Sequence, residues 1–123
     1  MRVLADTSIW VDHFRRADAQ LANLLDHGDV VIHPFVIGEL FLGGLPKSSG
    51  VLDDLNTLPK ATIASNDEVL EFIAKRKLSG LGIGYVDAHL LASTMLTLEA
   101  AIWTRDKRLL AAARSLKLAA DIL

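Results

Sequence analysis

The sequence predicts an α/β fold in which a parallel sheet of about five strands lies between two layers of helices. Short runs of β-prone apolar residues alternate along the chain with longer segments whose apolar residues recur every three or four positions. Strands that alternate with helices favour a parallel sheet that is covered on both faces. The chain has 123 residues and contains no linker, repeat or low-complexity tract. We therefore expect residues 1–123 to form a single domain.

The expected strands are all short. They are Arg2–Ala5, Val30–His33, Ala61–Ala64, Ala101–Thr104 and a short edge strand at Leu118–Ala120. The expected helices lie between them and take their limits from apolar periodicity, caps and Pro34. They cover 17–27, Phe35–Leu42, a segment marked by Val51, Leu55 and Leu58, a segment opened by Ser65 or Asn66 that reaches Arg76, Tyr85–Leu98, and Lys107–Ser115.

The composition excludes several classes of protein. The chain has no cysteine, which excludes a disulfide framework, a thiolate metal site and a cysteine nucleophile. No run approaches the roughly 20 apolar residues that a membrane helix needs, and the first residues lack the apolar stretch of a signal peptide. We expect a soluble cytoplasmic protein with no membrane partner. The net charge of −2 carries no basic signature for nucleic acid, and it does not exclude a phosphate-rich substrate.

Two acids follow expected strands. Asp6 comes directly after the first strand, and Asp106 lies two residues past Thr104 at the end of the fourth. In an open parallel sheet, ligands bind outside the carboxyl ends of the strands, so both acids are expected at one functional edge. Each of them, taken alone, is better explained as the N-cap of the helix that follows it than as a ligand.

Two further acids lie in apolar helices. Glu39 has apolar neighbours on nearly every side of the segment Phe35–Leu42, and charged residues are almost never fully buried unless they are paired or bind a metal. The alternative is that Glu39 lies on a narrow exposed stripe. Asp87 begins a nearly uncharged helix, where an acid also complements the helix dipole. Together with Asp6 and Asp106, these residues form a set of four acids that helix capping alone does not explain.

The chemistry that four such carboxylates support is narrow. Hard oxygen ligands suit Mg²⁺ or Mn²⁺ and not zinc. Clustered acids repel one another strongly unless a cation lies between them, so a bound metal explains why they coexist. A metal there can activate water and stabilise charge on a phosphoryl group, which favours phosphodiester hydrolysis. The four histidines lack ligand spacing, and no glycine-rich phosphate loop is present.

At this point the chain resembles the PIN-domain family, and its length and motif order are similar to those of VapC-type toxins. The segments that carry the resemblance are Val3–Ser8, Glu39 in its apolar helix, Tyr85–Ala92 and Ile102–Asp106. The resemblance implies a three-layer sandwich with a five-stranded parallel sheet. It also implies a Mg²⁺- or Mn²⁺-dependent endoribonuclease that acts as the toxin of a toxin–antitoxin pair.

The resemblance also implies roles for single residues. Asp6, Glu39, Asp87 and Asp106 match the four acidic positions of the family, with Asp6 and Asp87 as the most direct metal ligands. Thr104 matches a threonine whose hydroxyl orients the acids, and Ser8 or Thr7 matches a polar position beside the first acid. The implied partners are an RNA substrate, a VapB-like antitoxin that covers the groove of the active site, and a second copy of the chain in a homodimer.

Two other functions remain open at this point. The first is a non-catalytic α/β protein-binding module whose acids are only helix caps. The second is another α/β phosphate enzyme, such as a phosphatase or a phospho-acceptor receiver domain. That class calls for an Asp-x-Asp motif after the first strand, and the sequence Asp6-Thr7-Ser8 lacks it.

Overall fold

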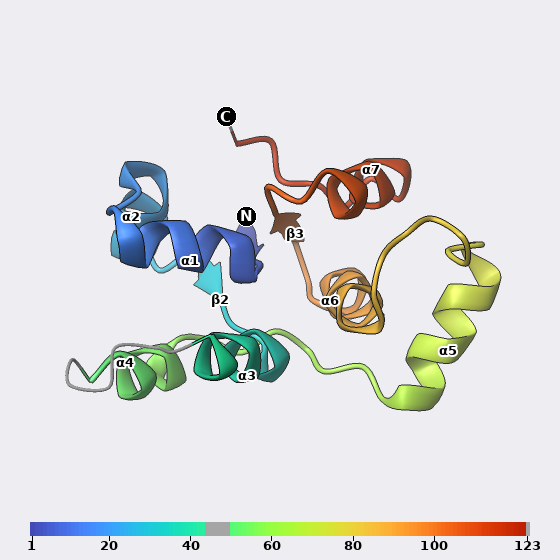
Figure 1. The fold of residues 1–123 in the computed structure, drawn as a ribbon, viewed down its shortest axis with the longest axis horizontal. Helices are drawn as coiled ribbons and strands as arrows, with labels where there is room; N and C mark the ends of the chain where they lie inside the picture. The colour runs from blue at the N-terminus through green and yellow to red at the C-terminus, as the bar shows by residue number, and fades with distance from the viewer. Residues whose placement is uncertain (44–49, 123) are drawn as a thin grey trace.

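The computed structural model of the chain describes residues 1–43 and 50–122. Its strands are β1 (Arg2–Ala5), β2 (Val30–Val31) and β3 (Ala100–Trp103). Its helices are α1 (Thr7–Arg15), α2 (Ala19–Asp26), α3 (Pro34–Leu42), α4 (Val51–Thr57), α5 (Asn66–Lys75), α6 (Tyr85–Leu96) and α7 (Lys107–Ser115). The sheet lies in the middle of the molecule, with α1 to α4 on one side and α5 to α7 on the other (Figure 1).

The sheet has the strand order β2-β1-β3, and both pairings are parallel. The central strand β1 is buried through Val3, Leu4 and Ala5, which explains why its sequence is a continuous apolar run rather than an alternating one. The predicted α/β class, with a parallel sheet between helices, is confirmed.

Each edge of the sheet is shorter than predicted. Ala61–Ala64 forms no strand; only Lys60 pairs with Ile32, through a single parallel bridge. The Ala61 N–H still donates to the Ile32 carbonyl, but Thr62 donates to Oγ1 of Thr97, the C-cap of α6, and Ala64 donates to Ser93 Oγ within α6. At the opposite edge, Leu118–Ala120 pairs with Ile102 through a bridge at Ala119. Within residues 1–43 and 50–122, the prediction of about five strands is therefore corrected to three strands with one bridging residue at each edge.

The predicted helices are present, with small shifts at their ends. α7 has the predicted limits, and α5 begins after Ser65, which forms a capping box with Glu68. α6 ends at Leu96 rather than at Leu98, because the Thr97 side chain donates to the Ser93 carbonyl and closes the last turn. α1 is the one helix to which the sequence assigned no range, although Asp6, Thr7 and Ser8 were recognised as candidate caps.

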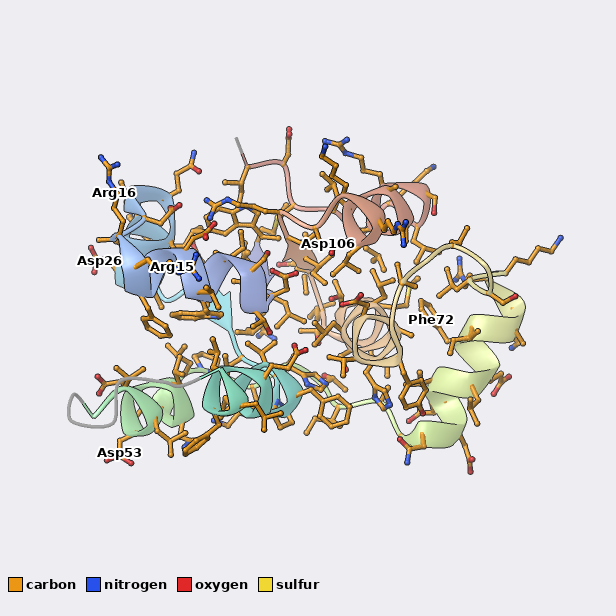
Figure 2. All side chains as sticks on the ribbon, in the orientation of Figure 1. Arg15, Arg16, Asp26, Asp53, Phe72 and Asp106 are labelled. Carbon is orange, nitrogen blue, oxygen red and sulfur yellow. The ribbon has the colours of Figure 1, made fainter. Side chains whose placement is uncertain are left out.

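Helix α6 is the most deeply buried of these helices. Its residues Ala88 to Thr94 are all buried, and it packs against β3 and against α5, from which Phe72 points toward it (Figure 2). The first turn of α6 carries Asp87, so a well-packed helix fixes the position of this acid. Among the helices described, none is long and apolar enough to cross a membrane.

Candidate active site

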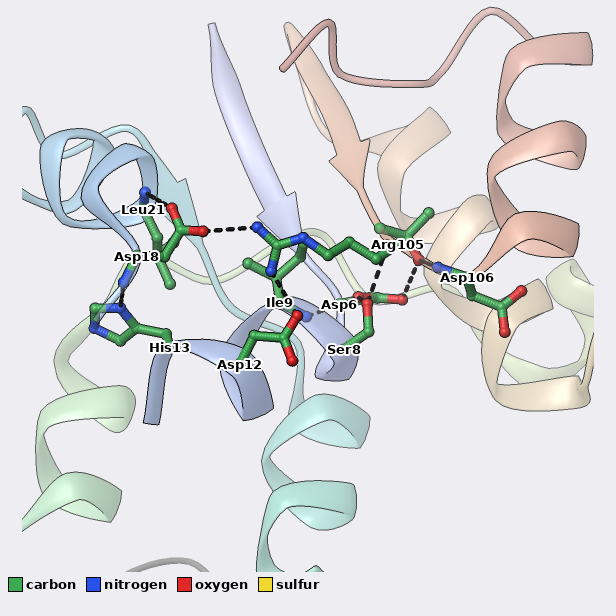
Figure 3. A network of polar contacts seen from close by, with 10 residues as sticks. Asp6, Ser8, Ile9, Asp12, His13, Asp18, Leu21, Arg105 and Asp106 are labelled. Atoms are coloured by element: carbon green, nitrogen blue, oxygen red, sulfur yellow. Dashed lines mark hydrogen bonds and ion pairs between the residues drawn. The ribbon is translucent and has the colours of Figure 1, made fainter. Parts of the chain in front are cut away.

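The ends of β1 and β3 bring two of the predicted site segments together. Ala5 pairs with Trp103, and the Asp6 backbone N–H continues the ladder by donating to the Trp103 carbonyl at 3.0 Å. The next residue of the β3 segment, Thr104, donates its hydroxyl to Asp6 Oδ2 at 2.5 Å and accepts from the Asp106 backbone N–H at 3.0 Å. One hydroxyl therefore links the two acids that follow the strands (Figure 3).

The other oxygen of Asp6 is held from its own helix. Ser8 Oγ donates to Asp6 Oδ1 at 2.5 Å, and the Ile9 backbone N–H donates to the same oxygen at 3.4 Å. The Ser8 hydroxyl also accepts from the backbone N–H of Arg105 at 3.1 Å. Asp6 is only 6% exposed, and this burial raises the pKa of its carboxyl, while the hydrogen bonds from Ser8 and Thr104 act in the opposite direction.

Glu39 approaches this group from α3, although not as the sequence suggested. Its Oε1 accepts from Thr7 Oγ1 at 2.6 Å, and Thr7 directly follows Asp6. Glu39 is exposed rather than buried, and its apolar neighbours Phe41 and Leu42 are themselves 52% and 91% exposed. The inference that Glu39 is a buried charge was therefore wrong, and the exposed-stripe alternative describes its surroundings better.

Asp87 is half-buried at the start of α6, where its Oδ2 accepts from the Gly84 backbone N–H at 3.2 Å. Burial is the main cause that raises the pKa of Asp87. The negative charges of Asp106, Asp6 and Glu39 raise the pKa further. The four acids predicted from the sequence thus lie close enough for all three of the others to repel the charge on Asp87.

Three of the four acids also act as helix caps. Asp6 caps α1, Asp106 caps α7 through the N–H groups of Arg108 and Leu109, and Asp87 binds the N–H that precedes α6. Capping and membership of a common site are therefore compatible. Caps alone explain where each acid lies on its own helix, but they do not explain why three helix starts and Glu39 converge.

The donor set suits a hydrated hard cation better than a closed protein cage. Within residues 1–43 and 50–122, no group of three or more histidine, aspartate or glutamate side chains is arranged to hold a metal ion. Magnesium usually binds one or two carboxylates and keeps several waters, so it does not require such a group. A cation among these acids would favour their ionised forms and offset the repulsion that Asp87 experiences.

Arg105 is a polar residue at this edge whose role the sequence did not reveal. Its guanidinium binds Asp12 at 2.7 Å and Asp18 at 2.6 Å, and it lies 5.4 Å from the centre of the Trp103 ring. These contacts connect α1 and the start of α2 to the loop after β3 (Figure 3). The partners are 93 and 87 residues away in sequence, so no local pattern could have indicated them.

His33 is a second residue that sequence reasoning missed. Its Nδ1 accepts from the Phe35 backbone N–H at 3.0 Å and thereby caps α3, the helix that carries Glu39. Its Nε2 lies 3.1 Å from Ser93 Oγ. Burial, with a smaller effect of His89, lowers the pKa of His33 to about 4. The capping ring is therefore neutral at physiological pH.

Comparison with known proteins gives a family and two similar relatives. The sequence model of the PIN domain matches residues 3–115 of the chain. Two curated proteins, both named Ribonuclease VapC32, come from Mycobacterium tuberculosis strains CDC 1551 / Oshkosh and ATCC 25618 / H37Rv. Each is 47% identical to this chain over 110 residues, which cover 89% of this chain and 89% of the relative.

Proposed function

Because this chain belongs to the PIN-domain family and is of the VapC type, we propose that it is a metal-dependent endoribonuclease, the toxin of a toxin–antitoxin pair. The observation that carries the proposal is the convergence of four carboxylates on the strand-end edge, where ligands bind in parallel α/β sheets. The relatives named as ribonucleases support RNA as the substrate. We take residues 1–123 as a single PIN-like domain, in keeping with a family match that covers residues 3–115.

We assign the following roles to the residues of the proposed site. Asp6 and Asp87 offer the least exposed carboxylates and would bind the metal most directly, while Glu39 and Asp106 complete the site through ligation or bound waters. Thr104 and Ser8 hold the two oxygens of Asp6, and Thr7 holds Glu39.

The metal would be Mg²⁺ or Mn²⁺, as the all-oxygen donor set indicates. When bound, such an ion supplies an activated water and stabilises the charge that develops on the phosphoryl group. The four acids would hold such an ion at the edge of the sheet, and the hydroxyls of Thr104 and Ser8 fix the orientation of Asp6.

The proposed partners are a VapB-like antitoxin, which covers the groove of the site, and a second copy of the chain in a homodimer. Support comes from the similarity to VapC proteins and from apolar side chains that a monomer leaves in water. Leu42 is 91% exposed and Leu98 is 74% exposed. Exposed apolar surface of this kind is typical of sites that bind other proteins.

The direct test is RNA cleavage by purified wild-type protein and by Asp6→Asn and Asp87→Asn, each with Mg²⁺, with Mn²⁺ and with a chelator. We expect wild-type cleavage to require the ion, and each substitution to reduce it by more than about a hundredfold. Asp53→Asn is the matched control, because Asp53 lies on α4, far from Asp106 (Figure 2). Equal cleavage by Asp6→Asn, Asp87→Asn and wild type would refute the proposed site.

A non-catalytic binding module is the second candidate, and one observation favours it: Asp6, Asp87 and Asp106 all accept helix N–H groups. Calorimetric titration with Mn²⁺ separates the two candidates. A module whose acids are only caps gives no heat that depends on Asp6 or Asp87. The nuclease gives heat that Asp6→Asn removes and Asp53→Asn leaves.

A further inference from the structure

Three aromatic side chains form a bridge between α3 and α6 beside the proposed site. The ring of His89 lies 4.7 Å from that of Phe35 and 4.6 Å from that of Tyr85, measured between centroids. Phe35 comes from the first turn of α3, and Tyr85 is the first residue of α6. We call Phe35, His89 and Tyr85 the aromatic bridge.

The outer rings of the bridge are accessible, whereas the middle ring is not. Phe35 is 38% exposed and Tyr85 is 48% exposed, but His89 is only 2% exposed. Both ring nitrogens of His89 lack a hydrogen-bond partner among the described residues, so this side chain serves as a spacer rather than as a polar contact. The interplanar angles of 55° and 88° exclude parallel stacking. Phe35 also contacts the ring of His33, with the centroids 5.1 Å apart and the rings at 71°, so the surface that a flat ligand can cover is the solvent-exposed part of Phe35 and Tyr85.

The bridge adjoins the proposed site through α3. Phe35 and Glu39 are four residues apart on α3, so they share one face of the helix and lie about one turn, or about 5.4 Å, apart along its axis. Tyr85 lies two residues before Asp87 on α6, so the two side chains point to different sides of the helix, and Tyr85 joins the bridge through His89 one turn further on. A chain bound at Glu39 would therefore pass within about one helix turn of Phe35.

Polar groups border the exposed end of the bridge. The hydroxyl of Tyr85 donates to Asn66 Oδ1 at 3.4 Å, and Asn66 is exposed at the start of α5. Single-stranded RNA is recognised by stacking of bases on aromatic rings and by hydrogen bonds to base edges. A ring beside an amide offers both kinds of contact, which favours a nucleobase over an aliphatic protein side chain as the occupant.

From these observations we propose that Phe35 and Tyr85 form a stacking subsite for an unpaired base next to the cleaved phosphodiester. The inference rests on the proposed function, since it concerns the same RNA. It assigns specificity to a surface outside the four acids: a substrate is cut where a base can leave its stack and lie on these rings. His89 acts as a positioning residue that holds the two rings apart.

The test measures binding and cleavage separately. Binding uses short single-stranded oligoribonucleotides that carry a fluorescent adenine analogue at successive positions, whose emission falls when the base stacks. The variants are Phe35→Leu and Tyr85→Leu, which remove a ring but keep much of the apolar volume, and Tyr85→Phe, which keeps the ring. Phe41→Leu is the matched control, because Phe41 is an exposed aromatic residue on α3 whose position faces away from Phe35.

We expect Phe35→Leu and Tyr85→Leu to weaken binding by about 5- to 150-fold, the value of one base–aromatic stack, and to raise KM more than they lower kcat. Tyr85→Phe and Phe41→Leu should stay close to wild type. Circular dichroism checks that each variant is folded. An oligoribonucleotide that lacks one base beside the cleaved bond should bind wild-type protein more weakly than the complete oligoribonucleotide by the same factor. Tyr85→Leu should not weaken the binding of this oligoribonucleotide further.

Three results would overturn the inference. One is binding of RNA by both leucine variants as tight as wild type. Another is a loss confined to binding of an antitoxin, which would make the bridge a protein-docking surface. The third is cleavage of the oligoribonucleotide that lacks the base at the same rate as the complete one. Failure of the wild-type protein to cut any RNA would contradict the proposed function instead, while fluorescence quenching that depends on the rings would still report a base on the bridge.

Discussion

His33 makes the start of α3 sensitive to acid. The ring can cap the helix only while Nδ1 is unprotonated, because Nδ1 accepts the N–H of Phe35. Burial lowers the pKa of His33 from 6.5 to about 4. Between these two pH values the unfolded chain binds a proton that the folded chain excludes, so stability falls as the pH falls through this window and is fully present above it.

The size of the effect follows from the two pKa values. A difference of one unit corresponds to about 1.36 kcal/mol, so the shift of His33 is worth about 3 kcal/mol of unfolding free energy, lost between pH 6.5 and pH 4. That is a large part of the 5 to 15 kcal/mol, roughly, that stabilises an ordinary domain. We expect the loss to begin at the end of α3 that His33 caps.

The assay is urea unfolding, followed by circular dichroism at a series of pH values, for wild type and His33→Asn. Asparagine caps helices well and does not titrate, so the variant keeps the cap and removes the proton site. Groups other than His33 titrate in both proteins, and the difference between the two curves therefore isolates His33. The wild-type curve should fall by about 3 kcal/mol more than the variant curve toward acid. His27→Asn, a substitution at an exposed histidine, is the control and should give the same curve of unfolding free energy against pH as wild type. Parallel curves for wild type and His33→Asn would refute the reasoning.

Two more perturbations test the polar contacts of the strand-end edge. Thr104→Val removes the hydroxyl that binds the buried carboxylate of Asp6 and should lower the unfolding free energy at neutral pH by about 1.5–3 kcal/mol. Thr104→Ser keeps a hydroxyl and should retain most of the wild-type stability. An equal loss in the serine variant would show that the hydroxyl is not responsible. Arg105→Ala breaks ion pairs with Asp12 and Asp18 that are partly open to solvent, so the unfolding free energy measured by urea denaturation should fall by less than about 1 kcal/mol per pair. The loss should be smaller at high salt. A large loss that salt does not change would contradict this prediction.

The parts of the fold that local sequence determines were predicted well. β1 is a short apolar run followed by a capping residue, and α7 begins at an aspartate cap and follows its own periodicity, so both have the predicted limits. Asp6 and Asp106 were placed at one edge because parallel strands align their carboxyl ends, and the pairing of Ala5 with Trp103 confirms that placement.

The parts that depend on distant contacts were not predictable in this way. The segment Ala61–Ala64 has the composition of a strand, but two of its N–H groups, those of Thr62 and Ala64, bind side chains of α6 and its C-cap about 30 residues away. The exposure of Glu39 depends on which face of α3 its neighbours cover, and the apolar pattern of α3 does not reveal that face. Arg105 has partners in two other helices, and sequence spacing carries no information about such a contact.

The strand order of the sheet also governs when the site can exist during synthesis. β1 lies in the centre and is made before both of its partners, and β3 is made only after β2 and the helices α1 to α6. Until Ala100–Trp103 has left the ribosome, one side of β1 has no strand to pair with, and Asp6 lacks the hydroxyl of Thr104. A nascent chain that stops before β3 lacks the strand pairing and the hydroxyl that hold Asp6, so we expect the RNA-cutting activity proposed here only after β3 and Thr104 have been made.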